Sequence, residues 1–271
     1  MGYKCGILNL LFEKKGNRTI ASNIFYHGAL KVIRPQYSEN GQIGYILVNP
    51  GGGYLQGDLY RIDLKLKNCA DVHLTTQAAT KIYRTDQDAA RQYLAIQLRD
   101  QSRLEFLPGP IIPYAGSDFV QNQTVEMDKG CSLFLSSIMT GGYDVQHRKF
   151  TFKQIDLKTK IFFEQRLKVF DRLHFMRDDP LEKSGYMAGF SHLGSVVAIY
   201  PKFSENDILA LRRWLPNDQE IISGITTLSV PGFIIRFLSY RTQIIERQIQ
   251  RVLKFFRKKC NNDERVVKNE F

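Results

Sequence analysis

The period of the hydrophobic pattern is the feature that most constrains the fold of this chain. From residue 42 to about 170, apolar and polar residues alternate in short runs, as they do in half-buried β-strands. Clear runs occupy residues 60–67, 92–99 and 148–154. Such runs recur roughly every ten residues and are separated by Gly, Pro, Asn and Asp, which favours a sandwich, barrel or stacked-sheet fold over alternating strands and helices.

A weak internal sequence repeat, here called the echo, supports a stacked arrangement of strands. Residues 64–76 align with residues 125–137 at a constant offset of 61 and without a gap, so that Leu64 coincides with Val125. Each copy predicts a strand, a tight turn and a second strand. Two copies do not establish a solenoid, for which three or more are usual. Chance alternation in two β-hairpins is the alternative, but the echo suggests two stacked layers of similar strands.

Helices are expected only late in the chain. Ser204, followed by three residues of which two are acidic, predicts a helix N-cap, and Pro216 predicts the stop. A second helix is expected over residues 239–258, with one apolar stripe and basic residues on the other faces. This helix can pack on the β body, dock in a partner's groove or lie on a membrane surface, and packing is preferred. No low-complexity linker divides the chain, so we expect a single domain over residues 1–271.

Composition bounds the class of protein. The four cysteines are far apart and form no CxxC pair, so zinc ribbons, redox dithiols and a disulfide framework are not expected. We expect a cytoplasmic protein, because no signal peptide is recognisable and no uncharged run approaches the ~20 residues of a membrane span. The net charge of +11 is compatible with nucleic acid, an anionic membrane, an acidic protein partner or simply a soluble surface.

A glycine cluster, NPGGGYLQGD at residues 49–58, looks at first like a phosphate cradle. The P-loop requires a lysine where this chain has Asp58, whose carboxylate would repel phosphate. The dinucleotide fingerprint requires a glycine where the chain has Gln56, and an alternating strand follows instead of a helix. Neither a zincin spacing of histidines nor a GxSxG elbow is present. The sequence therefore predicts neither a nucleotide site nor an enzyme.

The same glycine stretch, followed by LTTQAATKIYR, resembles the paired signature of the urease accessory protein UreD family, also called UreH. Further segments resemble that family in the same order, at residues 103–121, 189–197 and 230–239. The resemblance covers roughly residues 20–255. Four motifs in register make it specific.

The resemblance implies an assembly role in loading nickel into apo-urease. It implies partners, namely UreF, the GTPase UreG through UreF, and the urease apoprotein, with homo-oligomerisation within the accessory complex. It also implies an all-β (mostly β) fold, with strands in a stacked, helix-like arrangement and about two α-helices near the C-terminal end. No tightly bound cofactor is expected, and nickel would bind only transiently in a passage. The alternative is a basic nucleic-acid-binding β protein, for which residues 233–241 have a suitable composition but aromatic spacing that core packing explains better.

A nickel passage should hold the ion weakly, with acids and hydroxyls. Asp58 ends the glycine loop, where we expect an accessible carboxylate, and Glu164 is a lone acid in an apolar strand. Both match positions that are acidic in the family. As alternatives, Asp58 caps its own loop and Glu164 pairs with Arg166. Hydroxyls for the same passage are expected from Thr75, Thr76 and Thr80.

The remaining motif residues are expected to shape the loop. Sharp backbone turns are expected at Gly51, Gly52, Gly53 and Gly57. Tyr83 is expected to pack under this loop, while Lys81 and Arg84 reach solvent or an acidic partner. The chain also departs from the family, because Ser137 and Arg61 stand at or near positions that are commonly acidic. If nickel passes close to them, the path is less negative here or other groups compensate.

Overall fold

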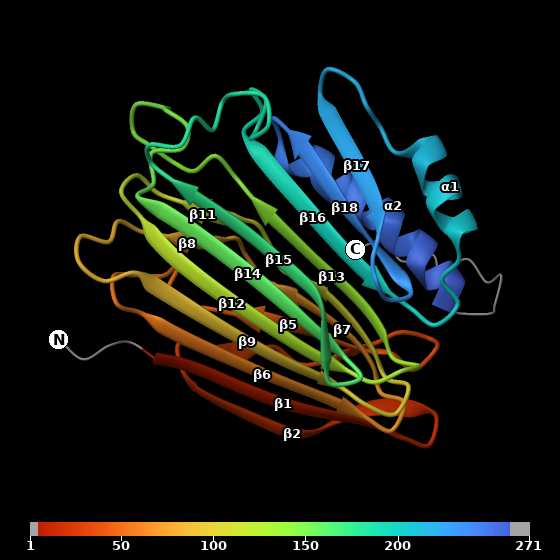
Figure 1. Cartoon of the computed structure of the whole chain (residues 1–271). Coiled ribbons are helices and arrows are strands. Elements are labelled where there is room, and N and C mark those ends of the chain that lie inside the picture. Colours follow the sequence, from red (N-terminus) through yellow and green to blue (C-terminus); the bar gives the residue numbers. More distant parts are fainter. Residues whose placement is uncertain (1–4, 261–271) are drawn as a thin grey trace.

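The computed structural model describes residues 5–260, and two β-sheets make up most of it (Figure 1). The first sheet has seven strands in the spatial order β15, β14, β12, β9, β6, β1, β2. The bounds of these strands are β1 (Cys5–Lys15), β2 (Arg18–Gly28), β6 (Leu59–Lys67), β9 (Ala90–Leu98), β12 (Asp118–Met127), β14 (Gln154–Phe163) and β15 (Arg166–Met176).

The second sheet has eleven strands, of which eight lie in the order β17, β18, β16, β13, β10, β7, β5, β3. The short strand β4 pairs with β5, and β11 joins β8 to β13. The bounds are β3 (Lys31–Val32), β4 (Gln36–Tyr37), β5 (Ile43–Val48), β7 (Asp71–Thr76), β8 (Thr80–Ile82), β10 (Arg103–Leu107), β11 (Ile111–Pro113), β13 (Ser132–Met139), β16 (His192–Ile199), β17 (Ile221–Thr227) and β18 (Gly232–Ser239).

The chain winds between the two sheets as a β-solenoid of about four turns. In the central turns β6 leads to β7, β9 to β10 and β12 to β13, so each turn adds one strand to each sheet. Strands of successive turns are parallel, as β6 is to β9 and β7 is to β10. The expected fold class, mostly β with a stacked, helix-like arrangement of strands, is confirmed.

The stacking explains the sequence echo. Leu64 pairs with Ile96 on the next turn, and Ile96 pairs with Val125 on the turn after that. The second sheet repeats this relation through Val72, Leu104 and Leu133. The two echoing segments therefore lie two turns apart, with an intermediate copy between them. The hairpin alternative is wrong, because each tight turn joins strands that belong to different sheets.

One expected strand is not formed. Residues 148–153 are irregular, and strand β14 begins only at Gln154. Phe150 has a left-handed backbone with φ of 57°, and its amide donates to the carbonyl of Gly141. Phe150 and Phe152 are both buried, with ring centroids 6.3 Å apart. Two core-facing aromatics in a loop imitate the period of a strand.

The sheets differ in what covers them, and the sequences of their strands follow. The first sheet packs one face on the core and turns the other to solvent, so β12 alternates between buried and half-buried residues. The second sheet has its inner face in the same core and its outer face under helices. Strand β13 is therefore almost continuously buried, as expected for a strand covered on both sides.

Both predicted helices are present, as α1 (Glu205–Trp214) and α2 (Thr242–Cys260). Ser204 is the N-cap of α1, and Asp207 accepts its backbone N–H at 3.1 Å. The apolar stripe of α2 is buried against the second sheet through Ile245, Ile249, Val252 and Phe256. Packing on the β body, the preferred alternative for α2, is therefore confirmed.

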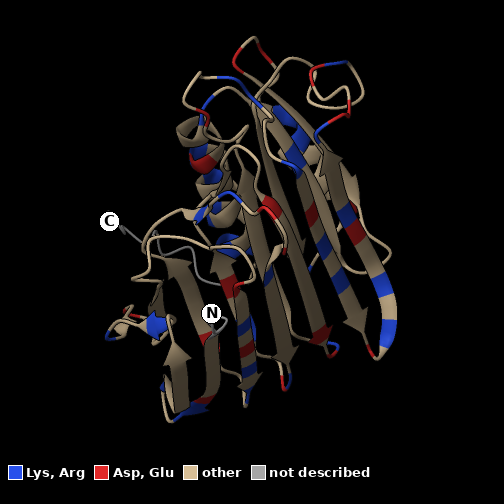
Figure 2. Ribbon diagram, turned by 90° about the vertical axis from the view of Figure 1, so that its left-hand side faces the viewer, with Lys and Arg blue, Asp and Glu red and all other residues tan. Residues whose placement is uncertain are grey.

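Charge is distributed widely over the molecule. Figure 2 shows basic residues on several strands, on loops and on the helical part, with acidic residues among them. Neither α1 nor α2 combines the length and the apolar character needed to cross a lipid bilayer, and they are the helices of the described part of the chain.

Candidate functional site

The glycine loop lies directly against the second signature segment. The amide of Tyr54 donates to the carbonyl of Lys81 at 2.8 Å, and the amide of Tyr83 donates to the carbonyl of Tyr54 at 2.9 Å. A Cβ atom on Gly53 would lie 2.7 Å from that Lys81 oxygen, so only glycine fits. Gly52 has φ of 74°, a backbone conformation that glycine adopts readily. The two motifs of the signature therefore form one structural unit.

Polar groups of the glycine loop form hydrogen bonds within the loop and with Tyr83. The amide of Gly51 donates to Oδ1 of Asn49 at 3.1 Å, and the amide of Gly52 donates to the carbonyl of Asn49 at 3.3 Å. The hydroxyl of Tyr83 lies 3.4 Å from the carbonyl of Gly52, to which it donates. Lys81 is half-buried, whereas Arg84 is exposed and pairs with Asp86. Loop amides held in this way are not free to cradle a phosphate.

Asp58 closes the loop from within. Asp58 is only 3% exposed, so the expectation of an accessible carboxylate is wrong. Oδ2 accepts the amide of Leu55 at 2.9 Å and the hydroxyl of Tyr60 at 3.1 Å. Gly57, with φ of 71°, turns the backbone so that this carboxylate can fold back. These are the contacts of the alternative role, a cap on its own loop. A pocket of about 410 Å³ adjoins Asp58, and Gly51 and Gly53 also line it.

Glu164 lies elsewhere and in a different kind of structure. It occupies the turn between β14 and β15, with φ of 52° for Glu164 and 62° for Gln165. The expected position inside an apolar strand is therefore wrong. Glu164 is exposed, and its Oε1 accepts the amide of Lys129 at 2.9 Å. Its partner is thus the Lys129 amide, in place of Arg166, the partner in the alternative. The sequence did not predict this hairpin, because its two turn residues, Glu164 and Gln165, are left-handed and yet neither is a glycine or an asparagine.

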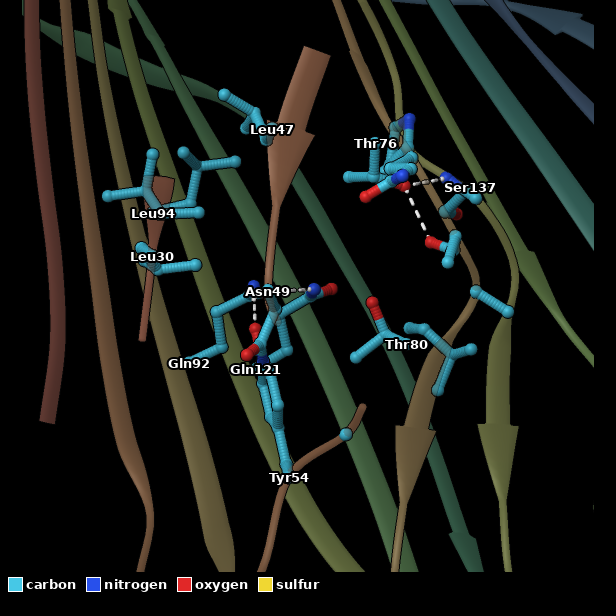
Figure 3. A pocket seen from close by; sticks show the side chains of 18 of the residues that line it. Leu30, Leu47, Asn49, Tyr54, Thr76, Thr80, Gln92, Leu94, Gln121 and Ser137 are labelled. Carbon is cyan, nitrogen blue, oxygen red and sulfur yellow. Dashed lines mark hydrogen bonds between the residues drawn. The ribbon is translucent and has the colours of Figure 1, made fainter. Parts of the chain in front are cut away.

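A cavity of about 100 Å³ lies between the two sheets, next to the glycine loop (Figure 3). Four of the predicted site residues line it together, namely Gly52, Gly53, Thr76 and Thr80. Thr75 does not, because it faces the other way and its hydroxyl donates to the carbonyl of Leu107 at 2.8 Å. Ser137, the residue that departs from the family pattern, also lines the cavity. Arg61 is exposed on the first sheet and pairs with Asp63.

The first sheet lines this cavity with a row of hydrogen-bonded amides, here called the amide chain. Thr159 donates to Gln123, Gln123 donates to Gln121 at 3.0 Å, and Gln121 donates to Gln92. The amide of Gln92 then donates to the hydroxyl of Tyr54 at 2.7 Å. Burial raises the pKa of Tyr54, so every side chain of the amide chain is uncharged at neutral pH. Figure 3 shows Gln92, Gln121 and Tyr54 on one side of the cavity, and Thr76 and Ser137 on the other.

Sequence reasoning missed the amide chain, although a signal was present. Gln121 and Gln123 stand in phase with Phe119 and Val125 on the buried side of β12. Two amides at inward positions of an alternating strand indicate a polar interior. The described residues 5–260 contain no cluster of three or more His, Cys, Asp or Glu side chains that could hold a metal ion. The polar side chains that line the cavity are uncharged, and apolar side chains make up the rest of its lining.

A second buried polar group, here called the acid–arginine cluster, joins the second sheet to α2. Glu105 is completely buried, and Nδ1 of His73 lies 3.0 Å from its Oε2. Arg257 of α2 grips both carboxylate oxygens, at 3.0 Å to Oε1 and 2.6 Å to Oε2. Burial alone would raise the pKa of Glu105, but the hydrogen bonds from His73 and Arg257 lower it to about 2. His73 is thus a hydrogen-bonded structural histidine.

Comparisons with known proteins complete the picture. A family described as UreD urease accessory protein matches residues 4–269. The urease accessory protein UreD of Staphylococcus epidermidis is 38% identical over 252 residues, which is 91% of each chain. The proteins of the same name from Lachnoclostridium phytofermentans and Bacillus cereus are 35% and 31% identical over 94% and 96% of each chain. The chain belongs to the UreD family of urease accessory proteins.

Proposed function

We propose that this protein is a non-enzymatic scaffold of urease maturation that works in the cytoplasm. In this proposal it binds UreF, through UreF the GTPase UreG, and the urease apoprotein while nickel is inserted. Membership of the UreD family across nearly the whole chain carries the proposal. The glycine loop supports it, because the amides of Gly51 and Gly52 are bonded to Asn49 and are not available to a nucleotide phosphate.

The cavity between the sheets supports a further part of the proposal, a passage for nickel as cargo. A passage has to hold the ion weakly, and the amide chain with Thr76, Thr80 and Ser137 offers neutral ligands only. Nδ2 of Asn49, which lines the same cavity, is buried without a hydrogen-bond partner among the described residues. Water or a hydrated ion in the cavity would supply that partner. Glu164 lies outside the cavity lining, and we leave it out of the route.

The alternative of nucleic-acid binding is not favoured. It relied on the aromatics of residues 233–241 being exposed beside basic side chains. Phe233 and Phe237 are fully buried in the core beneath the helices. A salt titration separates the two functions, because nucleic-acid binding weakens steeply as salt rises. A stoichiometric complex with UreF that persists at high salt supports the scaffold.

Urease activation reconstituted from purified components tests the passage. Ser137→Leu places an apolar side chain in the cavity, and we expect less nickel per urease active site although the complex with UreF forms normally. Ser137→Ala keeps the cavity open and serves as the matched control. Normal nickel loading by Ser137→Leu, with the cavity shown to be filled in a crystal structure, would exclude this route.

A second pair of variants separates charge from capping at Asp58. Asp58→Asn keeps an oxygen that accepts the amide of Leu55 but removes the negative charge. Asp58→Ala removes both. If the charge guides nickel, both variants form the complex with UreF yet lower the rate of urease activation. If Asp58 is only a cap, Asp58→Asn activates urease at the normal rate and only Asp58→Ala is impaired.

A further inference from the structure

The first sheet ends in a strand whose free edge is open. Strand β2 pairs with β1 on one side, and within residues 5–260 no strand pairs with its other edge. The start of β2 is covered, because Thr19 is 1% exposed and its amide donates to the carbonyl of Gly41 at 3.2 Å. From Ser22 to Gly28 every residue is exposed. Seven residues of edge strand thus face solvent.

This open stretch is apolar. Ile24, Phe25 and Tyr26 are 39%, 50% and 49% exposed. Ile24 pairs with Leu10 and Tyr26 with Leu8, and both leucines are buried in the core. Ile24 and Tyr26 therefore continue the inner face of the sheet, on a strand that lies beyond the covered part of the core. A solenoid normally ends in a unit with a polar outer face, and residues 5–260 provide no such unit at this end.

The stretch also carries no charge. Residues 19–30 contain no Lys, Arg, Asp or Glu, although charged residues make up 24% of the chain. Proteins usually protect an edge strand with charges, proline or a covering segment. The opposite edge of the same sheet follows that rule, since β15 carries Arg166, Lys168 and Arg172, and Ser229 donates to its Lys168 carbonyl at 2.9 Å. The two edges of one sheet are therefore treated differently.

We propose that β2 pairs antiparallel with β2 of a second copy of this chain, across a two-fold axis. Two copies that each carry a net charge of +11 repel one another, and this uncharged stretch is where they can meet without opposing like charges. A pairing centred on Phe25 sets Ile24 opposite Tyr26, an aromatic and β-branched pair that stabilises antiparallel strands. The self-complementary geometry is the one that a two-fold dimer requires.

The dimer extends each seven-strand sheet into one of fourteen strands, by adding backbone hydrogen bonds along the edge. The contact is short, so it falls at the small end of protein interfaces and the dimer should dissociate reversibly. This inference is independent of the proposed role in urease maturation.

Sedimentation velocity of the full-length chain over a range of concentrations tests the proposal. We expect a reversible monomer–dimer equilibrium. Phe25→Lys sets two lysines opposite each other at the axis and should raise the dissociation constant at least about tenfold, through like-charge repulsion and the lost aromatic pair. Leu167→Lys is the matched control, because Leu167 is 48% exposed on the opposite edge strand β15. The control should dimerise like the unmodified chain.

Amide hydrogen exchange gives a second measurement. Residues 22–28 should gain protection as the concentration of the unmodified chain rises, and should not do so in Phe25→Lys. A chain that is monomeric at every concentration overturns the proposal, as does a dimer that Phe25→Lys leaves intact. If the chain is monomeric but Phe25→Lys weakens binding to another urease maturation protein, the edge binds a foreign partner and self-pairing is wrong.

Discussion

Two groups of buried polar side chains occupy the same β body and differ in charge. The amide chain lies between the sheets and is neutral from Thr159 to Tyr54. The acid–arginine cluster lies between the second sheet and α2, and it contains the ionised Glu105 held by Arg257. In the acid–arginine cluster the buried carboxylate has a charged partner close by, whereas the side chains of the amide chain satisfy one another without charge. Of these two groups, only the one that α2 covers carries charge, because the helix supplies the counter-ion Arg257.

Because of this difference, we expect damage to the acid–arginine cluster to affect stability and damage to the amide chain to affect nickel transport as well. The acid–arginine cluster fastens α2 to the solenoid, so its loss should be felt as a lower free energy of unfolding. The amide chain lines the cavity that we propose as a passage, so its loss should be felt in urease activation as well. The following variants test this contrast, from the largest expected effect to the smallest.

Removing Arg257 should have the largest effect. Arg257→Met leaves the carboxylate of Glu105 buried with His73 as its remaining hydrogen-bond partner, and breaking a buried ion pair in this way costs about 3 kcal/mol or more. Urea unfolding measures the loss. Arg251→Met is the control on the same helix, because Arg251 contacts the Trp214 ring and Gln248 at the surface and should cost less than about 1 kcal/mol. Equal losses would show that Glu105 does not depend on Arg257.

The pH dependence of stability should reveal the same cluster. The pKa of Glu105 falls from 4.5 in the unfolded chain to about 2 in the folded one, so its ionised form favours folding. That contribution, about 3 kcal/mol, is complete above pH 4.5 and is lost as the pH falls towards 2. Glu105→Gln lacks it, so the difference in unfolding free energy between the unmodified chain and Glu105→Gln should shrink over this range. A difference that stays constant would mean that Glu105 is not ionised in the folded state.

The same contrast shows what the sequence can predict. The alternation of apolar and polar residues predicted most strands. The alignment of Leu64 with Val125 also predicted which residues stack on successive turns, because residues paired across parallel strands have similar burial. The intermediate copy at Ile96 was present without a gap, at offsets of 32 and 29, but unequal spacing concealed it. Local caps such as Ser204 were also predicted, since their partners are close in sequence.

The missed features depend on contacts between distant residues. Glu105 and Arg257 are 152 positions apart, and nothing local in RLEFL shows that a helix will cover its outward face. Asp58 was predicted to be accessible because small residues let the backbone turn sharply around it, yet the Tyr60 hydroxyl and the Leu55 amide hold its carboxylate inside the loop. Glu164 was placed in a strand because its neighbours are apolar, and only the backbone shows that it makes the turn.

Interrupting the amide chain should have a moderate effect. Gln121→Leu keeps roughly the same volume but leaves an acceptor on Gln92 and a donor on Gln123 without their partner, at a cost of about 1–2 kcal/mol. Because no side chain of the amide chain titrates near neutrality, the loss in unfolding free energy should be the same at pH 4 and pH 7. Asn122→Leu, the next residue and on the opposite face of β12, should change stability by less than about 0.5 kcal/mol. A loss of unfolding free energy that differs between pH 4 and pH 7 would show that the amide chain contains a charged group.

The smallest effect is expected at the rim of the cavity. Gly52 has φ of 74°, and a Cβ atom there would approach only the Tyr83 hydroxyl, at 3.9 Å, so space is available and only the backbone resists substitution. Gly52→Val should cost about 1 kcal/mol, because a β-branched residue disfavours this conformation. Gly224→Val is the control: that glycine lies exposed in β17 without positive φ, and valine suits a strand. An unchanged melting temperature for Gly52→Val would mean that the rim relaxes to a conformation open to any residue. The cavity beside the amide chain would then have a deformable wall, and a fixed passage would require some other restraint, such as a bound partner.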